Sequence, residues 1–465
     1  MTPFLRATLL ASTLTLTLGV TACSDPAFDE NSQVGPNPAL PDPKNFLLPP
    51  IKVMTGVGWK PGQTPVVAAD LQIAPLAQNL AHPRMVYVLP NGDILAVQAK
   101  GPPPEPVKRP KDPITTKVKN TATSYPGGIK SASQITLIRD ANGDGKPELV
   151  TVLVDKLNSP FGVVWKDNIL YVANTDAVVM YPMPLGTTKI TAAPKTLTPL
   201  PGGPIDHHWT KSLTISPDGQ RLYATVGSNS NIVENGFEAE HNRAAVWEID
   251  RATGRSRIFA SGLRNSNSPN FYPGTNDLYV VVNERDEIGA HLVPDYLTRV
   301  QDGGFYGWPY SYYGQHVDNR IAPMDRRPDL VAKAIKPDYA LGSHVAALGL
   351  TFNTSTTLPA HYRGGGFIGE HGSWDRYSPS GYKIAFVPFV NGRPSGMAED
   401  VVTGFLDKER AHSFGRPVGV AIDRTGALLI ADDVGNVVWR VTGAPQTSVA
   451  AAPGPLKPGS PRPAT

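Results

Sequence analysis

The stretch LTISPDGQRLYATVG (213–227) decides the fold, because it is the clearest copy of a pattern that recurs along the chain. Each copy has an apolar strand, a polar turn containing Gly or Asn, and a second apolar strand. Alternation around such a turn predicts a β-hairpin. The other copies are MVYVLPNGDILAVQ (85–98), GVVWKDNILYVAN (162–174), NFYPGTNDLYVVVNE (270–284), LGLTFN with GGFIGEHGSW (348–353 and 365–374), and GVAIDRTGALLIADD (419–433).

Six hairpins recur about every 67 residues, which indicates radial repetition of one small sheet. We therefore predict an all-β chain that folds as a six-bladed β-propeller of four-stranded antiparallel blades. The spacing is uneven, so seven blades are also compatible with it. A propeller places its ligand site at one end of the central channel, so site residues should be scattered along the sequence, one or two per blade.

Composition narrows the possible functions. The 465 residues are 40% hydrophobic and 18% charged, which is enough for a large core. Lys and Arg number 43 against 40 Asp and Glu, so no net charge favours nucleic acid as a partner. The chain has one cysteine, which excludes internal disulfides, iron–sulfur clusters and thiolate zinc sites.

The first residues predict export. Residues 1–22 hold one Arg and then an apolar run, as a signal peptide does. Val20-Thr21-Ala22-Cys23 resembles a bacterial lipobox, in which Cys23 is lipidated; the alternative is a buried Cys near a plain secretory cleavage site. Several acyl chains anchor a protein stably. We expect a cell-envelope protein that faces the periplasm or the exterior and touches the membrane through its lipid alone.

Low-complexity segments flank the repeats and set the domain boundaries. Residues 1–22 are the predicted lipoprotein-type signal peptide, and residues 23–66 are Pro- and Asn-rich and predict a tether. The propeller is expected over 67–443. Residues 444–465 form a second low-complexity tail.

One loop has the spacing of a calcium ligand set. Asp140, Asn142 and Asp144 occupy positions one, three and five of a calcium loop, and Gly145 occupies position six. The twelfth position is Thr151, so the bidentate Glu of an EF-hand is missing. An Asx-rich turn between strands explains the same residues equally well. Any ion bound here would be structural.

Two adjacent histidines precede the third hairpin. His207 and His208 follow Asp206 in an extended segment, where neighbouring side chains point to different faces and rarely chelate one metal. One of them could face the channel as a base, since an ordinary His pKa of about 6.5 suits that role at neutral pH. Asp206 or the other His could orient the base. A loop His considered alone is more often structural.

Basic residues recur at the loops that enter or edge the blades. If several of them converge on the channel, they form a positive site suited to a polycarboxylate, because Arg binds carboxylates bidentately and Lys supplies a point charge. Taken singly, each is an ordinary surface charge. The candidates are Arg264 with Asn265, Arg376, Lys383 and Arg416.

Several longer segments together resemble the soluble PQQ-dependent sugar dehydrogenases, that is, the glucose/sorbosone dehydrogenase family and its L-sorbosone dehydrogenase-like branch. The resemblance spans roughly residues 80 to 442 in one consistent order. The segments that carry it include HHWTKSLTISPDGQRLYATVGSNSN (207–231), NERDEIGAHLVPDYLTRVQDGGFYGWPYSYYGQH (283–316), FIGEHGSWDR (367–376) and GRPVGVAIDRTGALLIADD (415–433).

The resemblance implies that pyrroloquinoline quinone (PQQ) and Ca²⁺ lie at the channel mouth. It implies that His208 is the base that takes a sugar hydroxyl proton while hydride passes from the same carbon to the quinone. Ca²⁺ would bind PQQ and the backbone carbonyls of Arg285 and Asp286. The residues implied to contact PQQ are Arg264, Asn265, Lys383, Arg416, Asn229 and, at the end of the first hairpin, Gln98.

The function implied is oxidation of an aldose or a sorbosone-like sugar aldehyde to the lactone or acid, with electrons passed to an external quinone or cytochrome. Two departures from the family pattern are the 266–269 loop and Gln98, where relatives often carry an acidic residue. Two other functions are compatible with a propeller. One is a calcium-dependent lactonase whose ion is held by side chains such as Asn229, Asn265, Glu284 and Asp286; the other is a non-catalytic surface binding propeller.

Overall fold

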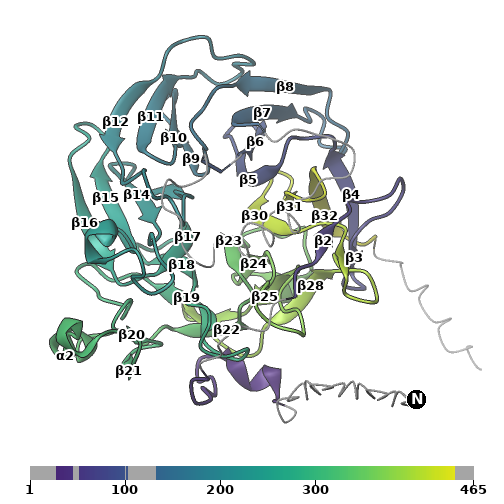
Figure 1. Ribbon diagram of the computed structural model, residues 1–465. Coiled ribbons are helices and arrows are strands. Elements are labelled where there is room, and N and C mark those ends of the chain that lie inside the picture. Colours follow the sequence, from purple (N-terminus) through teal and green to yellow (C-terminus); the bar gives the residue numbers. More distant parts are fainter. Residues whose placement is uncertain (1–27, 45–51, 100, 103–131, 446–465) are drawn as a thin grey trace, which may run out of the picture.

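Six antiparallel sheets are arranged as blades around one central axis (Figure 1). The computed structural model describes residues 28–44, 52–99, 101–102 and 132–445. The predicted all-β, six-bladed propeller is confirmed, and the seven-bladed alternative is wrong. Helix is nearly absent from these residues, and α2 (Pro328–Val331) has only four residues. None of the described helices is long and apolar enough to cross a membrane.

The first three blades have four strands each, in sequence order from the axis outward. They are β5 (Pro83–Val88), β6 (Ile94–Gln98), β7 (Gln134–Arg139) and β8 (Leu149–Val154); β9 (Val163–Lys166), β10 (Ile169–Ala173), β11 (Ala177–Pro182) and β12 (Lys195–Pro199); and β13 (Leu213–Ile215), β14 (Arg221–Val226), β15 (Ala245–Asp250) and β16 (Ser256–Ser261).

The last three blades recruit strands from distant parts of the chain. They are β17 (Asn265–Phe271), β18 (Leu278–Asn283), β19 (Pro294–Arg299) and β22 (Tyr339–Ser343); β23 (Ala347–Phe352), β24 (Gly366–Glu370), β25 (Lys383–Val387) and β28 (Glu399–Thr403); and β30 (Pro417–Ile422), β31 (Leu428–Asp432), β32 (Val437–Gly443) and β4 (Leu71–Ala77).

The repeated hairpins form the two innermost strands of each blade. In the third blade Leu213 lies opposite Ala224 and Ile215 opposite Leu222. Gly219 closes the turn with a φ of 73°, and its N–H donates to the Ser216 carbonyl at 2.8 Å. Glycine adopts that backbone conformation without steric cost. The local turn chemistry and the alternating burial therefore specify the same hairpin.

The two ends of the propeller sequence meet in the sixth blade. β4 pairs antiparallel with β32, so a strand from the start of the domain is the outermost strand of the sheet that ends it. β32 ends at Gly443, the predicted end of the propeller. This pairing closes the ring and leaves no open junction between first and last blades.

The segment predicted as a tether is instead bound to the propeller wherever it is described. β1 (Val34–Gly35) extends the fourth blade beside β22, and β3 (Val66–Val67) extends the fifth beside β28. β2 (Thr55–Gly56) pairs with β29 (His412–Ser413). These strands are too short to show a periodicity in the sequence, but the outer blade edges offer unpaired backbone groups to them. The signal peptide (1–22), Cys23 and tail residues 446–465 lie outside the described residues.

Chain direction decides which loops can share a site. Each inner strand begins at the end of the propeller where the adjacent second strand finishes, because the two are antiparallel. Contacts between blades join these ends: Ser228 N–H donates to the Arg264 carbonyl, and the Asn283 amide donates to the Ala347 carbonyl. We call this the entry end; it gathers the loops before β13, β17, β23 and β30 and the loops after β14, β18, β24 and β31.

Candidate functional site

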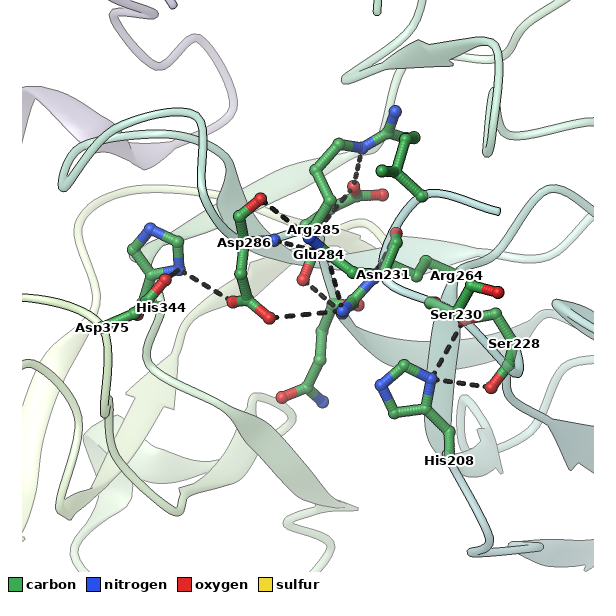
Figure 2. Close-up of polar contacts among 12 residues, drawn as sticks. His208, Ser228, Ser230, Asn231, Arg264, Glu284, Arg285, Asp286, His344 and Asp375 are labelled. Atoms are coloured by element: carbon green, nitrogen blue, oxygen red, sulfur yellow. Dashed lines mark hydrogen bonds and ion pairs between the residues drawn. The ribbon is translucent and has the colours of Figure 1, made fainter. Parts of the chain in front are cut away.

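His208 lies at the entry end, where Ser228 in the loop after β14 fixes the orientation of its ring. Its Nδ1 is 2.9 Å from the Ser228 carbonyl oxygen and 3.0 Å from Ser228 Oγ (Figure 2). A carbonyl oxygen only accepts, so Nδ1 carries the proton. The Ser228 hydroxyl donates onward to the Ser230 carbonyl at 2.6 Å. The neutral ring therefore keeps a lone pair on Nε2, the nitrogen that points away from Ser228.

The environment of His208 also favours the neutral ring. Burial, followed by the positive charges of Arg264 and His207, holds the pKa of His208 well below its usual value. At neutral pH the ring is uncharged, and Nε2 can accept a proton. The hydrogen bond at Nδ1 and the lowered pKa both leave Nε2 of His208 able to accept a proton.

Gly227 brings His208 and Asn265 close together. A Cβ at Gly227 would lie 2.6 Å from the Asn265 Oδ1 and 2.6 Å from the His208 Cβ. Both distances are far inside van der Waals contact, so any side chain must move one of the two residues. The close packing of three backbone segments here requires the absence of a side chain.

We expect Gly227→Ala to lower kcat/KM for the reaction proposed below by about 10²-fold, because a displacement of about 1 Å in a catalytic group has that effect. Steady-state kinetics on the cofactor-loaded variant measure it, with circular dichroism to verify folding. A folded variant with wild-type kcat/KM would contradict the placement of His208.

Arg264 contributes charge to the site but has no unused donor. Its Nε–H donates to the Asn231 carbonyl at 3.2 Å, and Nη2 donates to Asn231 Oδ1 at 3.0 Å and to Asp286 at 3.3 Å. Nη1 donates to the carbonyls of Asn283 and Glu284. All five N–H groups therefore have protein partners. Arg264 therefore connects Asn231, after β14 of the third blade, with the loop after β18 of the fourth blade; its neighbours Asn231 and Asp286 are labelled in Figure 2.

Asn265 and Asn229, both predicted to contact the cofactor, differ in whether the side-chain oxygen has a partner. Asn265 packs at Gly227, and its oxygen lies 3.4 Å from the Asn267 amide nitrogen. Asn229 donates from its amide to the Ala239 carbonyl at 2.8 Å, while its buried Oδ1 has no partner among the described residues. A buried oxygen without a donor is costly, and a bound ligand could supply one.

Arg285 and Asp286 follow β18 but point to different surroundings. Arg285 is fully buried between Glu284 at 2.9 Å and Asp318 at 3.0 Å, where it ties the loop to the blade. The Asp286 carbonyl, predicted as a Ca²⁺ ligand, accepts hydrogen bonds from Asn231 and Arg320, both at 3.1 Å. Its side chain instead faces His344.

Sequence reasoning missed a triad formed by Asp286, His344 and Asp375. His344 Nδ1 lies 3.4 Å from Asp286 Oδ1 and 3.3 Å from Asp375 Oδ2. Burial opposes protonation of His344, but the two carboxylates raise its pKa to about 9. Burial raises the pKa of Asp375 to about 7. His344 precedes β23 and Asp375 follows β24, so only the blade topology connects them to Asp286.

A second missed cluster at the same end surrounds Asp433. This carboxylate accepts from Arg84 at 2.7 Å and contacts His371 at 2.9 Å. Arg416, predicted at the site, donates to the carbonyls of His371 and Gly372 and stacks on the Tyr382 ring at 5.1 Å. Burial, then the charge of Arg416, lowers the pKa of His371 to about 3. Arg84 lies at the start of β5, Arg416 directly precedes β30 and His371 directly follows β24; this position at the ends of the two innermost strands is the signal that could have identified them.

Three other predicted residues pair with groups outside these clusters. Lys383 begins β25, the third strand of its blade, and pairs with Asp400 on the next strand outward. Gln98 is buried inside the first blade, where it binds the Ala81 N–H and the Thr136 hydroxyl. Arg376 binds Glu30 of the N-terminal segment and the Ser343 carbonyl. The predicted convergence of Lys383 with Arg264 does not occur.

The 140–148 loop lies at the opposite end of the propeller, because it follows β7. Asp140 accepts the N–H groups of Gly143, Asp144 and Gly145 at 2.8–3.1 Å, and Asn142 accepts from Asp144 at 2.9 Å. This is an Asx-turn arrangement. Asp140, Asn142 and Asp144 therefore cannot contribute to the entry-end site.

The residues of the entry end fit a polyanionic, hydrogen-bonding ligand such as PQQ, through contacts that differ in part from those predicted. Arg84 and Arg416 retain N–H donors that no described residue accepts: Nε of Arg84 is buried without a partner, and Nη1 of Arg416 makes no hydrogen bond. Together with Asn229 Oδ1 and His208 Nε2 they offer groups that carboxylates and ring N–H groups satisfy. Arg264 adds positive charge without a free donor.

Comparison with known proteins gives two family matches. Residues 173–370 match the family described as Glucose / Sorbosone dehydrogenase, and residues 325–444 match the one described as TrAA12-like. An uncharacterized protein of Borreliella burgdorferi is 28% identical over 310 residues, which cover 64% of this chain and 79% of that protein.

Solved structures with the same fold include the holo form of the pyranose dehydrogenase PQQ domain from Coprinopsis cinerea, at 18% identity, 84% coverage of this chain, 100% of that chain and a TM-score of 0.64. The calcium structure of an AA12 enzyme from Trichoderma reesei has 18% sequence identity and a TM-score of 0.65, and the match covers 86% of this chain and 99% of that chain. The PQQ-bound aldose sugar dehydrogenase from Streptomyces coelicolor has 14% sequence identity and a TM-score of 0.50, and the match covers 81% of this chain and 100% of that chain. At these identities they show the shared propeller fold. The family match over residues 173–370 confirms, for that stretch, the resemblance to the glucose/sorbosone dehydrogenase family that the sequence motifs indicate.

Proposed function

We propose that this protein is a PQQ-dependent oxidoreductase that oxidises an aldose or a sorbosone-like sugar aldehyde to the lactone or acid. The observation that carries the proposal is His208, whose Nδ1–H is committed to the Ser228 carbonyl and whose Nε2 keeps a lone pair at the entry end. The match to the glucose/sorbosone dehydrogenase family supports it. So do the pyranose and aldose sugar dehydrogenases with the same fold, which bind PQQ.

His208 performs the proton transfer in this reaction. Its Nε2 accepts the proton of the substrate hydroxyl, so the O–H bond breaks as the carbon–oxygen double bond forms. The Ser228 carbonyl accepts from Nδ1–H throughout and stabilises the imidazolium that results. When bound, PQQ supplies the two-electron acceptor for the hydride that leaves the same carbon.

We propose that the anionic cofactor binds to hydrogen-bond donors that have no partner within the described part of the protein. We assign its carboxylates to Arg416 and Arg84, and a donor on its ring system to Asn229 Oδ1. Asn265 positions His208 through the contact at Gly227. The proposal includes Ca²⁺ as the Lewis acid of the site. In this structure the Asp286 carbonyl, its predicted ligand, accepts two hydrogen bonds from the protein.

The test uses the purified apo protein from Ser24 onward, which keeps β1 on the fourth blade, with PQQ and either Ca²⁺ or EDTA. A panel of aldoses is then added while the cofactor absorbance is recorded. We expect binding of PQQ and its reduction by at least one sugar. Bound PQQ that no sugar reduces would contradict the substrate class, and absence of binding would favour a lactonase or a binding propeller.

The charge state of His208 can be checked without cofactor. We expect NMR titration of the apo protein to give a pKa for this ring below 6.5, because burial and the charge of Arg264 disfavour the protonated form. The ring thus charges only as the pH falls through that lowered pKa. The signal is assigned by its loss in His208→Ala. A value at or above 6.5 would contradict the neutral-base assignment.

The cellular setting extends the proposal. We propose that the protein is exported, lipidated at Cys23, and reoxidised by an external quinone or cytochrome. Cys23→Ser should abolish incorporation of labelled palmitate in expressing cells and release the protein from the membrane fraction, since the lipid is the proposed anchor. Palmitate labelling that persists in the variant would contradict the lipobox interpretation.

A further inference from the structure

The triad of Asp286, His344 and Asp375 has the arrangement of a metal site built from side chains. Its three ligand atoms lie within 4.8 Å of one another, and they come from the loop after β18, the turn before β23 and the loop after β24 (Figure 2). His344 and Asp375 are buried, whereas the Asp286 side chain is 20% exposed and gives solvent access.

The orientation of His344 is set by a backbone carbonyl. Its Nε2–H donates to the Gly289 oxygen at 3.1 Å, so Nδ1 is directed between the two carboxylates. Metal-ligating histidines are typically held in this way, with the second nitrogen donating to a carbonyl or carboxylate. An independent observation is Asp375 Oδ1, which is buried and has no hydrogen-bond partner among the described residues.

The distances suit a metal better than a pair of hydrogen bonds. Charge-assisted N–H···O bonds are about 2.7–2.9 Å long, whereas Nδ1 lies 3.4 Å from one carboxylate and 3.3 Å from the other. Ligands of a tetrahedral ion with bonds of about 2.0–2.1 Å are about 3.3–3.4 Å apart. The two measured separations equal the edge length of such a tetrahedron.

We propose that Asp286, His344 and Asp375 bind one divalent metal ion of the Zn²⁺ or Mn²⁺ class. A nitrogen ligand with two carboxylates suits these ions, while Ca²⁺ takes oxygen ligands. The ion would neutralise the negative charges of the two carboxylates, which both contact Nδ1 of His344. Arg264 contacts only Oδ2 of Asp286, which leaves Oδ1 for the metal. The inference depends on the side-chain geometry alone and stands whether or not the proposed oxidoreductase function is correct.

Isothermal titration of the full-length protein, freed of metal with EDTA, tests this with ZnCl₂, MnCl₂ and CaCl₂ at pH 7. We expect one Zn²⁺ or Mn²⁺ per chain, bound at least tenfold more tightly than Ca²⁺. Because the metal must displace the proton that Nδ1 holds, the measured heat should change with the ionisation enthalpy of the buffer. Tighter binding of Ca²⁺, or no binding of Zn²⁺ or Mn²⁺, would overturn the proposal.

Variants locate the site. His344→Gln and Asp375→Asn should each weaken binding of the preferred metal at least tenfold. His412→Gln is the matched control, because His412 forms an exposed pair with Asp407 at 2.7 Å that could bind metal adventitiously. Loss of binding in His412→Gln but not in His344→Gln would overturn the assignment. If a triad variant fails to fold, the Co²⁺ spectrum of the wild-type protein decides instead: an intense visible band supports four-coordinate binding at a nitrogen and oxygen site, and its absence contradicts it.

Discussion

Replacing His208 with alanine is expected to lower kcat/KM for sugar oxidation by about 10²–10⁴-fold, the usual contribution of a general base. The substrate hydroxyl would then lose its proton only to water. Because Nδ1 contacts only Ser228 and the ring is not among the donors assigned to the cofactor, we expect PQQ affinity to change less than threefold. Stopped-flow reduction of the bound cofactor measures the chemical step directly.

His361→Ala is the control for this variant, since His361 is exposed at the outer edge of the fifth blade, near Asp70 and Glu399. It should leave both rate and affinity unchanged. Added imidazole should partly restore the His208→Ala rate, which a purely structural role would not produce. A His208→Ala enzyme that reduces its cofactor at the wild-type rate would exclude His208 as the base.

Replacing Arg285 with methionine is expected to lower the free energy of unfolding by about 3–5 kcal/mol, because it leaves the buried Glu284 carboxylate without its counter-charge and leaves Asp318 with Arg320 alone. Arg285 is fully buried and bonds Glu284, Asp318 and the carbonyls of Pro309 and Ser311. Burial disfavours the ionised Asp318, yet hydrogen bonds from Arg320 and the charge of Arg285 lower its pKa to about 2. Urea unfolding followed by tryptophan fluorescence measures the change.

Arg327→Met is the matched control, because Arg327 forms an exposed pair with Asp329 at 2.7 Å. Exposed pairs contribute about 0–1 kcal/mol, so its unfolding midpoint should barely move. An Arg285→Met protein as stable as this control would show that Glu284 and Asp318 find other partners or are protonated in the native state.

The hairpins could be predicted because their determinants are local. A turn such as Pro217-Asp218-Gly219 and the alternating burial on both sides of it lie within fifteen residues. The contribution of 28–44 and 52–67 could not be predicted, because these segments supply only two-residue strands, which pair with partners far away in sequence. Such edge pairing depends on backbone groups that every residue carries, so it leaves no signal in the side chains.

The sequence predicted only part of the grouping of candidate residues. His208, Arg264 and Asn265 are brought together because they lie on successive blade entries, which the repeat spacing already indicates. Lys383 does not join them, since it starts a third strand and pairs outward with Asp400. The sequence cannot distinguish a basic residue at an inner strand from one at an outer strand when both follow a similar loop.

The sequence by itself determined the strand-turn-strand repeat and limited the number of blades to six or seven, and its resemblance to a family indicated His208 as the base. Only the tertiary structure decided which charges are free to bind a ligand. The N–H groups of Arg264 all donate to Asn231, Asp286 and the carbonyls of Asn283 and Glu284. His344 and Asp375 lie next to Asp286, which belongs to another blade. The physical reason is that a hairpin depends on neighbours in the chain, whereas the availability of a donor depends on acceptors that ring closure brings from other blades.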